Sequence, residues 1–207
     1  IRQDIDNGFS LDARSNYDRI INDLSVSALW RVNSAVDLTA GYSLINQWPL
    51  DDAFDFNKSV TNQFRGALNY SPTGAWSTGV EGGYYHINYT EAVNNNSNNI
   101  TFGPYLSVPI TRYTQVRVAG GWQWGDYQRG GLNEDTTQLN SFYANLRIEN
   151  QLNAYLQQSF GVGRGNNSGV VSNFTAQTWF RYAITARLNQ TAISSGVYLS
   201  RQRDSGG

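Results

Sequence analysis

The sequence predicts an all-β fold: an up-and-down antiparallel β-barrel of about eleven or twelve long strands. Three observations predict it. Apolar residues recur at every second position, the alternating segments run to about ten residues or more, and the connections between them alternate between short and long. A period of two residues gives a strand one apolar and one polar face. We treat residues 1–207 as a single barrel domain, or as part of a larger barrel in a longer chain.

Composition agrees with this class. Tyr (13 residues) and Gly (20 residues) are frequent, aromatic residues make up 14% of the chain, and the net charge is −1. This is a strand and turn composition. The absence of Cys excludes a disulfide framework, and the near-neutral charge offers no basic field to nucleic acid. The chain contains no Met, so we expect it to be a processed or trimmed product.

The alternation is clearest at Leu24, Val26, Ala28 and Trp30, where polar residues lie between the apolar ones. It recurs at 36–44, 64–70, 76–84, 100–108, 116–124, 142–148, 156–162 and 174–184. A first strand near 5–13 and a last strand near 190–200 complete the set. Segments of this length exceed the five or six residues typical of soluble strands and suit a tilted crossing of hydrocarbon.

The connections differ in length at the two ends of the strands. Short turns are predicted at 33–35, 71–75, 111–113, 151–153 and 185–187. Long polar loops are predicted at 46–59, 90–99, 126–138 and 163–169. Repetition of strand, tight turn, strand and long loop describes a meander of hairpins. Short turns at one end and long loops at the other are typical of transmembrane barrels.

Aromatic residues cluster near both ends of the strands. Trp30, Tyr70 and Trp76 lie beside short turns, whereas the long-loop side carries Tyr84, Trp122 and Trp124, with Tyr85, Tyr127 and Tyr143 close by. The stretch from Trp76 to Tyr84 spans roughly 20–25 Å along the membrane normal, at about 3.3 Å per residue and a tilt of about 40°. Amphipathic rings at this spacing predict two interfacial girdles.

The pattern resembles the outer-membrane β-barrel or porin-like superfamily of Gram-negative bacteria. The resemblance covers nearly the whole chain and includes the repeats Ala40-Gly-Tyr42, Gly82-Gly-Tyr84 and Gly120-Gly-Trp122. It implies location in the bacterial outer membrane, with short turns in the periplasm and long loops outside the cell. Such barrels usually have an even number of strands and end in an aromatic residue. This chain departs on both points, with about eleven strands and a polar end at 201–207.

The polar face carries the functional prediction, a porin-like passive channel for ions or small solutes. Its expected pore-lining residues are Arg65, Glu81, Arg117, Arg147, Glu149 and Arg181. In the alternative, these charges neutralise one another inside a non-conducting structural or adhesion barrel whose loops bind a partner. A soluble β-sandwich binding module, with the apolar faces packed together, is a third possibility. Expected partners are the lipid bilayer and small solutes, with lipopolysaccharide, a second copy or a partner subunit as further candidates.

We predict no catalytic residue, metal site or cofactor, and we do not expect an enzyme. His86 is the single histidine and has no catalytic partner specified by sequence. The loop acids Asp51, Asp52 and Asp55 match no calcium-binding spacing and are interpreted as a solvated loop. The glycines of 161–165 precede no predicted helix, so strand-end flexibility explains them better than phosphate binding.

Overall fold

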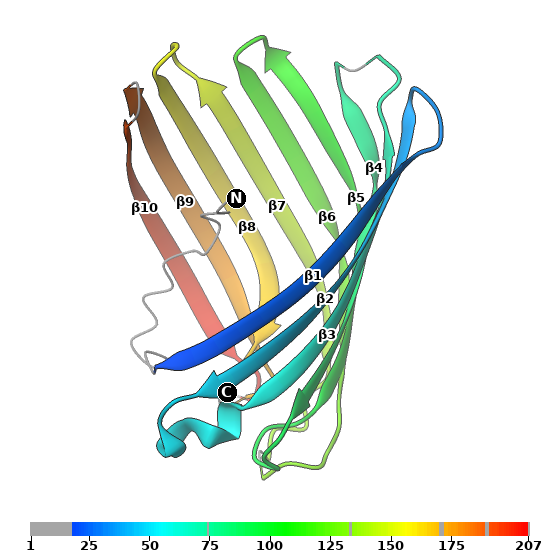
Figure 1. Ribbon diagram of the computed structural model, residues 1–207, viewed down its shortest axis with the longest axis vertical. Coiled ribbons are helices and arrows are strands. Elements are labelled where there is room, and N and C mark those ends of the chain that lie inside the picture. The colour runs from blue at the N-terminus through cyan, green and yellow to red at the C-terminus, as the bar shows by residue number, and fades with distance from the viewer. Residues whose placement is uncertain (1–17, 74, 133, 170–171, 189–190, 207) are drawn as a thin grey trace.

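The structure, a computed structural model, describes residues 18–73, 75–132, 134–169, 172–188 and 191–206. These residues form one sheet of ten antiparallel strands, each hydrogen-bonded to its neighbour in the chain (Figure 1). The strands are β1 (Arg19–Arg31), β2 (Val36–Pro49), β3 (Ser59–Tyr70), β4 (Ser77–Tyr89), β5 (Ser97–Thr111), β6 (Thr114–Tyr127), β7 (Leu139–Gln151), β8 (Leu156–Ser168), β9 (Phe174–Leu188) and β10 (Thr191–Asp204). The predicted all-β, up-and-down antiparallel meander is confirmed.

The two ends of the sheet differ as the sequence predicts. Short turns lie at the top of Figure 1, and longer loops lie at the bottom together with the 3₁₀ helix η1 (Asp52–Asn57). The strands are 12 to 15 residues long. No helix among the described residues has the length and apolar character needed to cross a membrane.

Three details of the prediction change. The expected strand at 5–13 lies outside the described residues, so the described strands number ten rather than eleven or twelve. The predicted loop at 163–169 is wrong, because β8 continues to Ser168. The predicted turn at 185–187 is also wrong, since β9 keeps pairing with β8 and β10 through these positions and ends at Leu188.

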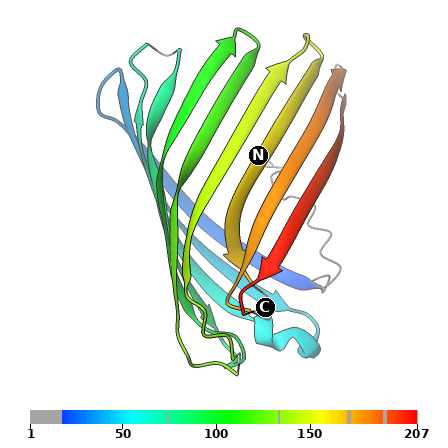
Figure 2. The ribbon, with the colours of Figure 1, turned by 180° about the vertical axis from the view of Figure 1, so that it is seen from behind.

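The sheet has two free edges. The edge strands are β1, which pairs only with β2, and β10, which pairs only with β9. Among the described residues, β1 and β10 do not pair with each other (Figure 2). Closure into a barrel therefore stays a prediction. An edge strand presents a row of backbone N–H and C=O groups that no neighbouring strand satisfies.

Strand register sorts the side chains onto two chemically different faces. On the outer face, Val26 pairs with Tyr42, which pairs in turn with Phe64, and such rows continue across the sheet. Outward residues carry even numbers in β1–β9 and odd numbers in β10. This apolar face is exposed: Phe64 retains 51% of its accessible surface, whereas the inward Gln63 retains 3%.

The sheet is curved (Figure 2), and the buried side chains of its strands lie on the inner, concave face. The buried apolar residues there are Tyr105, Ala119, Tyr127 and Leu139, and the buried polar ones include Gln63, Ser97 and Ser107. Within the described ranges no second sheet covers the apolar face. This distribution is the reverse of a water-soluble domain, in which large apolar residues are mostly buried.

Close backbone contact between β5 and β6 accompanies the curvature. A Cβ atom added to Gly121 would lie 2.1 Å from the carbonyl oxygen of Phe102 and 2.6 Å from the Cα of Gly103. Only residues without a side chain allow two backbones to approach this closely.

We therefore expect Gly121→Ala to lower the free energy of unfolding by about 1–3 kcal/mol, because the added methyl group must displace backbone. Gly66→Ala is the matched control, since its Cβ would meet nothing nearer than 3.8 Å. Urea unfolding of the refolded protein, followed by Trp fluorescence, measures both. Equal midpoints for the two variants would show that the close approach does not constrain the fold.

Candidate functional site

The concave face gathers the six residues predicted to line a pore. Each has inward parity on its strand, on the same side as the buried polar residues. They are Arg65 on β3, Glu81 on β4, Arg117 on β6, Arg147 and Glu149 on β7, and Arg181 on β9. The structure thus places all six on one wall, although not in one cluster.

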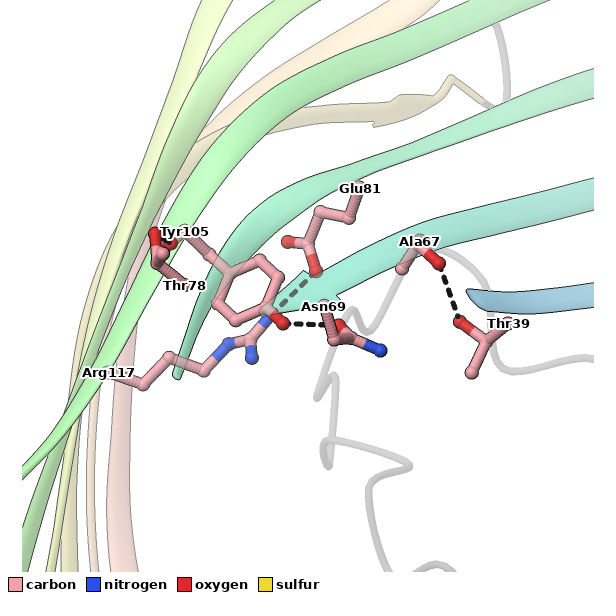
Figure 3. Close-up of polar contacts among 7 residues, drawn as sticks. All are labelled: Thr39, Ala67, Asn69, Thr78, Glu81, Tyr105 and Arg117. Carbon is pink, nitrogen blue, oxygen red and sulfur yellow. Dashed lines mark hydrogen bonds and ion pairs between the residues drawn. The ribbon is translucent and has the colours of Figure 1, made fainter. Parts of the chain in front are cut away.

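A connected group of side chains crosses four strands of this wall (Figure 3). The Arg117 Nη2 atom lies 2.6 Å from Glu81 Oε2, two strands away. The guanidinium lies over the ring of Tyr105 on the intervening strand, 4.1 Å from its centroid. The Tyr105 hydroxyl donates to Asn69 Oδ1 on β3. Charge, stacking and hydrogen bonding together fix the orientation of Arg117.

Three arginines share one row of the sheet. Arg117 lies directly opposite Arg147, and Gly161 of β8 separates Arg147 from Arg181. Arg147 Nη2 also lies 2.7 Å from Glu149 Oε1, two residues along the same strand. Like charges placed opposite each other repel, so the adjacent glutamates stabilise a row that would otherwise be unfavourable. The arrangement concentrates positive charge in a band across the wall.

Arg65 lies nearer the long loops than the row of Arg117, Arg147 and Arg181 does. It lines a hollow of about 810 Å³ on the concave side of β1–β7. Gly41 and Gly83 flank it on the neighbouring strands. Glu81, Tyr85 and other small or polar residues line the same hollow. The hollow is large enough for a small polar solute and presents both signs of charge.

Five of the six predicted interface aromatics have outward parity on their strands: Trp30, Tyr70, Tyr84, Trp122 and Trp124. Trp76 immediately precedes β4, and its ring lies 5.9 Å from that of the outward Tyr70, centroid to centroid. Sequence reasoning missed the amides beside them. Tyr42 donates its hydroxyl hydrogen to Asn62 Oδ1 at 2.7 Å, Tyr84 donates to Asn98 Oδ1 at 2.7 Å, and Trp122 Nε1 donates to Asn140 Oδ1. These pairs lie towards the long-loop end of the outer face.

Three rings expected near the girdle on the long-loop side instead face inward. Tyr85 has inward parity and packs over Gly83, with its Cε2 atom 3.1 Å from where a Cβ of that glycine would be. Tyr127 and Tyr143 also have inward parity, opposite Ser97 and Gly121. Since Tyr84 and Tyr85 are adjacent, alternation allows only one of them to face outward.

Trp179 covers two glycines of β8 in the same manner. A Cβ on Gly163 would lie 2.7 Å from the indole, and one on Gly161 would lie 2.9 Å from it. The glycine-rich segment 161–165 is therefore regular strand that makes room for an inward ring, not the flexible strand end that the sequence suggested.

The long loops form a hydrogen-bonded network, called here the loop cap. Its described residues are 50–58, 90–96, 128–132, 134–138, 169, 172–173 and Ser205. Asn94 Nδ2 donates to the Phe56 carbonyl oxygen at 3.1 Å, and Asn95 Nδ2 donates to Asn173 Oδ1 at 2.9 Å. The Asn57, Asn94, Asn95 and Asn173 side chains are buried. Asn57 Oδ1 accepts a hydrogen bond from Asn94 Nδ2 at 3.3 Å, whereas Asn57 Nδ2 is a buried atom without a partner among the described residues. The hydrogen bonds that do form hold the loops to one another.

Asp135 connects three segments of the loop cap. Its carboxylate accepts hydrogen bonds from the Asn173 and Thr137 backbone N–H groups and from the Ser205 hydroxyl. Burial raises the pKa of this carboxyl group, but these hydrogen bonds outweigh burial and lower the pKa to about 2. The ionised form is therefore the one that holds the network together.

Other candidate residues have local roles. His86 has outward parity, and its Nδ1 atom lies 2.9 Å from Asn98 Oδ1. Asp51 accepts a hydrogen bond from the Ala53 N–H and caps the 3₁₀ helix that contains Asp52 and Asp55. In the described part of the chain, no group of three or more His, Cys, Asp or Glu residues is arranged to hold a metal ion.

Substitution Asp135→Asn should loosen the loop cap, because an amide nitrogen cannot accept the hydrogen bonds that the carboxylate accepts. We expect faster tryptic cleavage after Arg129 at neutral pH, with Glu134→Gln as the exposed neighbouring control. A carboxyl pKa lowered from 3.8 to about 2 stabilises the folded form above pH 3.8, and this stabilisation is lost as the pH falls through about 2. Protection of the wild type against pepsin, a protease that is active at low pH, should therefore fall over that interval. Unchanged tryptic cleavage of the Asn variant at neutral pH would contradict the role of Asp135.

Comparison of the chain with protein-family models, with curated proteins and with solved structures gives no match. The functional assignment therefore depends on the geometry of the sheet itself.

Proposed function

We propose that this protein is an outer-membrane β-barrel that forms a passive channel for ions or small solutes. The observation that carries the proposal is the opposition of the two faces: exposed Val, Leu and Phe on the convex side, and buried or charged polar residues on the concave side. Lipid acyl chains would cover the apolar convex face, and water in a lumen would hydrate the polar concave face. In water the convex face would be a large exposed apolar patch of the kind that drives association.

Strand dimensions support a membrane span. Strands of 12 to 15 residues, at about 3.3 Å per residue and a tilt of about 40°, rise roughly 30–38 Å along the membrane normal. The apolar band of such barrels is about 25 Å tall. The strands therefore extend past the band at both ends, where the outward aromatic residues lie.

The free edges of β1 and β10 have a direct consequence in this proposal. Unpaired backbone groups in hydrocarbon cost several kcal/mol each, so both edges must be paired in the membrane. We infer that they pair with each other or with further strands, which closes the sheet around the concave face.

The row formed by Arg117, Arg147 and Arg181 would then project into the lumen and set its ion preference. Rings of charged side chains select ions by sign. Arg117 forms a salt bridge with Glu81, and Arg147 forms one with Glu149. The electrostatic field at the row is therefore set by both the positive and the negative side chains.

A non-conducting barrel is the second candidate, and two observations favour it. The ion pairs of the wall neutralise part of its charge, and the loop cap ties the long loops together at one end. In that case the loop end would bind a partner, and the polar interior would serve only to fill the barrel.

Arginine placed on the two faces should have opposite consequences for folding into lipid. Leu146→Arg puts a charge on the convex face near the middle of β7 and should destabilise the lipid-folded protein by about 2–4 kcal/mol. The adjacent Asn145→Arg puts the same charge on the concave face and should cost far less. Heat-modifiable gel migration after refolding into vesicles measures both, and equal folding of the two variants would refute the membrane assignment.

Channel activity is tested by conductance in planar bilayers. The wild-type protein should conduct, and Arg117→Glu with Arg147→Glu should shift the reversal potential in a salt gradient towards cation preference. Arg129→Glu, a charge reversal in an exposed loop, is the control and should leave the reversal potential near the wild-type value. A correctly folded protein that never conducts would favour the second candidate over the channel.

A further inference from the structure

Polar inward side chains on β1–β3 surround one position that has no side chain, that of Gly41. Ser27 of β1 and Arg65 of β3 lie directly opposite Gly41, one on each side. Thr39 and Ser43 lie two residues away along β2, so alternation turns them to the same concave face. All five residues line the hollow of about 810 Å³. We call this group, three hydroxyls and one guanidinium around a glycine, the Gly41 cradle.

The position at Gly41 is open, whereas its counterpart on the other side of Arg65 is covered. A Cβ atom on Gly41 would lie 3.6 Å from a backbone carbonyl oxygen of β1 and 3.8 Å from the Ser27 Cβ atom, both ordinary contacts. On β4, the Tyr85 hydroxyl oxygen lies 3.3 Å from where a Cβ atom of Gly83 would be. The open approach to Arg65 is therefore on the Gly41 side.

Arg65 has no counter-charge in the described part of the chain. It takes part in none of the three salt bridges formed there, and no hydrogen bond engages it. Glu81, the acid among the residues that line the hollow, lies diagonally across from Arg65. That carboxylate is bound instead to Arg117, whose Nη2 atom lies 2.6 Å from Glu81 Oε2. Because the acid already has a partner, the Gly41 cradle carries an excess positive charge that attracts an anion.

The hydroxyls of the Gly41 cradle keep hydrogen-bonding capacity for a ligand. Thr39 Oγ1 donates to a backbone carbonyl oxygen of β3 at 3.3 Å (Figure 3), and Ser43 Oγ donates to Ser25 Oγ at 3.1 Å. Each of these two donating oxygens retains lone pairs that can accept a further hydrogen bond. The backbones of Ser27 and Arg65 are about 10 Å apart, at two strand spacings. One short molecule can therefore contact the guanidinium at one end and the hydroxyls at the other.

We propose that the Gly41 cradle binds a small hydroxylated carboxylate, whose carboxylate group lies on Arg65 and whose hydroxyl groups contact the hydroxyl side chains. The inference rests on the proposed function, because it assigns a class of solute to the same hydrated wall. A guanidinium pairs its N–H donors with both oxygens of a carboxylate. An uncharged polyol would leave Arg65 without an anion, and a bare inorganic anion would leave the hydroxyl side chains unused.

The test is isothermal titration calorimetry of the refolded full chain in detergent, with gluconate as the probe. Sorbitol, which has an alcohol in place of the carboxylate, is the matched ligand and should not bind measurably. Arg65→Gln should weaken gluconate binding by about tenfold, because a charge-assisted contact is lost. Gly41→Ala keeps every charge but places a methyl group in the cradle, and it should also weaken binding. Arg201→Gln, the same charge change on the outer face, is the control and should bind as the wild type does.

The results separate the site from the channel. Conductance without gluconate binding would overturn the site and leave the channel proposal intact, whereas gluconate binding by a protein that never conducts would do the reverse. Wild-type affinity in folded Arg65→Gln, or in Gly41→Ala if that variant does not fold, would overturn the site. Equal affinity for sorbitol would overturn the role of charge. Displacement of gluconate by an equal concentration of sulfate would overturn the carboxylate assignment in favour of a free-anion site.

Discussion

The separation of apolar and polar side chains onto opposite faces is the constraint on which the rest of the structure depends. It is maintained because the register keeps outward residues paired with outward residues from β1 to β10, with one exception between β5 and β6. A slip of one residue at any hairpin would move a whole strand's apolar set to the other face. The register irregularity between β5 and β6 lies at Pro109–Thr111, beside a turn, where it leaves the central rows undisturbed.

The concave face meets a second requirement, because a curved sheet crowds its inner side chains. Gly103 and Gly121 relieve crowding where backbones approach, and Gly161 and Gly163 make room for the Trp179 indole. A large inward ring thus lies over glycines, which have no side chain to block it. On the same face, Arg117 of β6 lies over the Tyr105 ring of β5 and reaches Glu81 of β4, a strand with which β6 does not pair.

Much of the fold could be predicted from the sequence because a period of two residues determines both element type and face. The inward orientation of the six charged residues follows from parity alone, and so does the outward orientation of those interface aromatics that lie in strands. The extent of β8 was not predictable in this way, because its glycines resemble a loop until Trp179 is placed over them. Tyr85 was assigned to the girdle by composition, although its position next to Tyr84 already excluded that orientation.

The contacts across the loop cap could not be predicted, since nothing in a run of asparagines specifies partners on distant loops. Their separation along the chain also sets an order of assembly. Strand pairing joins neighbouring segments and can proceed hairpin by hairpin. The Asn95–Asn173 bond spans 78 residues, and the Ser205–Asp135 bond spans 70. The loop cap therefore cannot be completed until the last hairpin has paired with the sheet. Its formation is a late folding event that requires the correct strand topology. It therefore distinguishes fully folded molecules from partly folded ones.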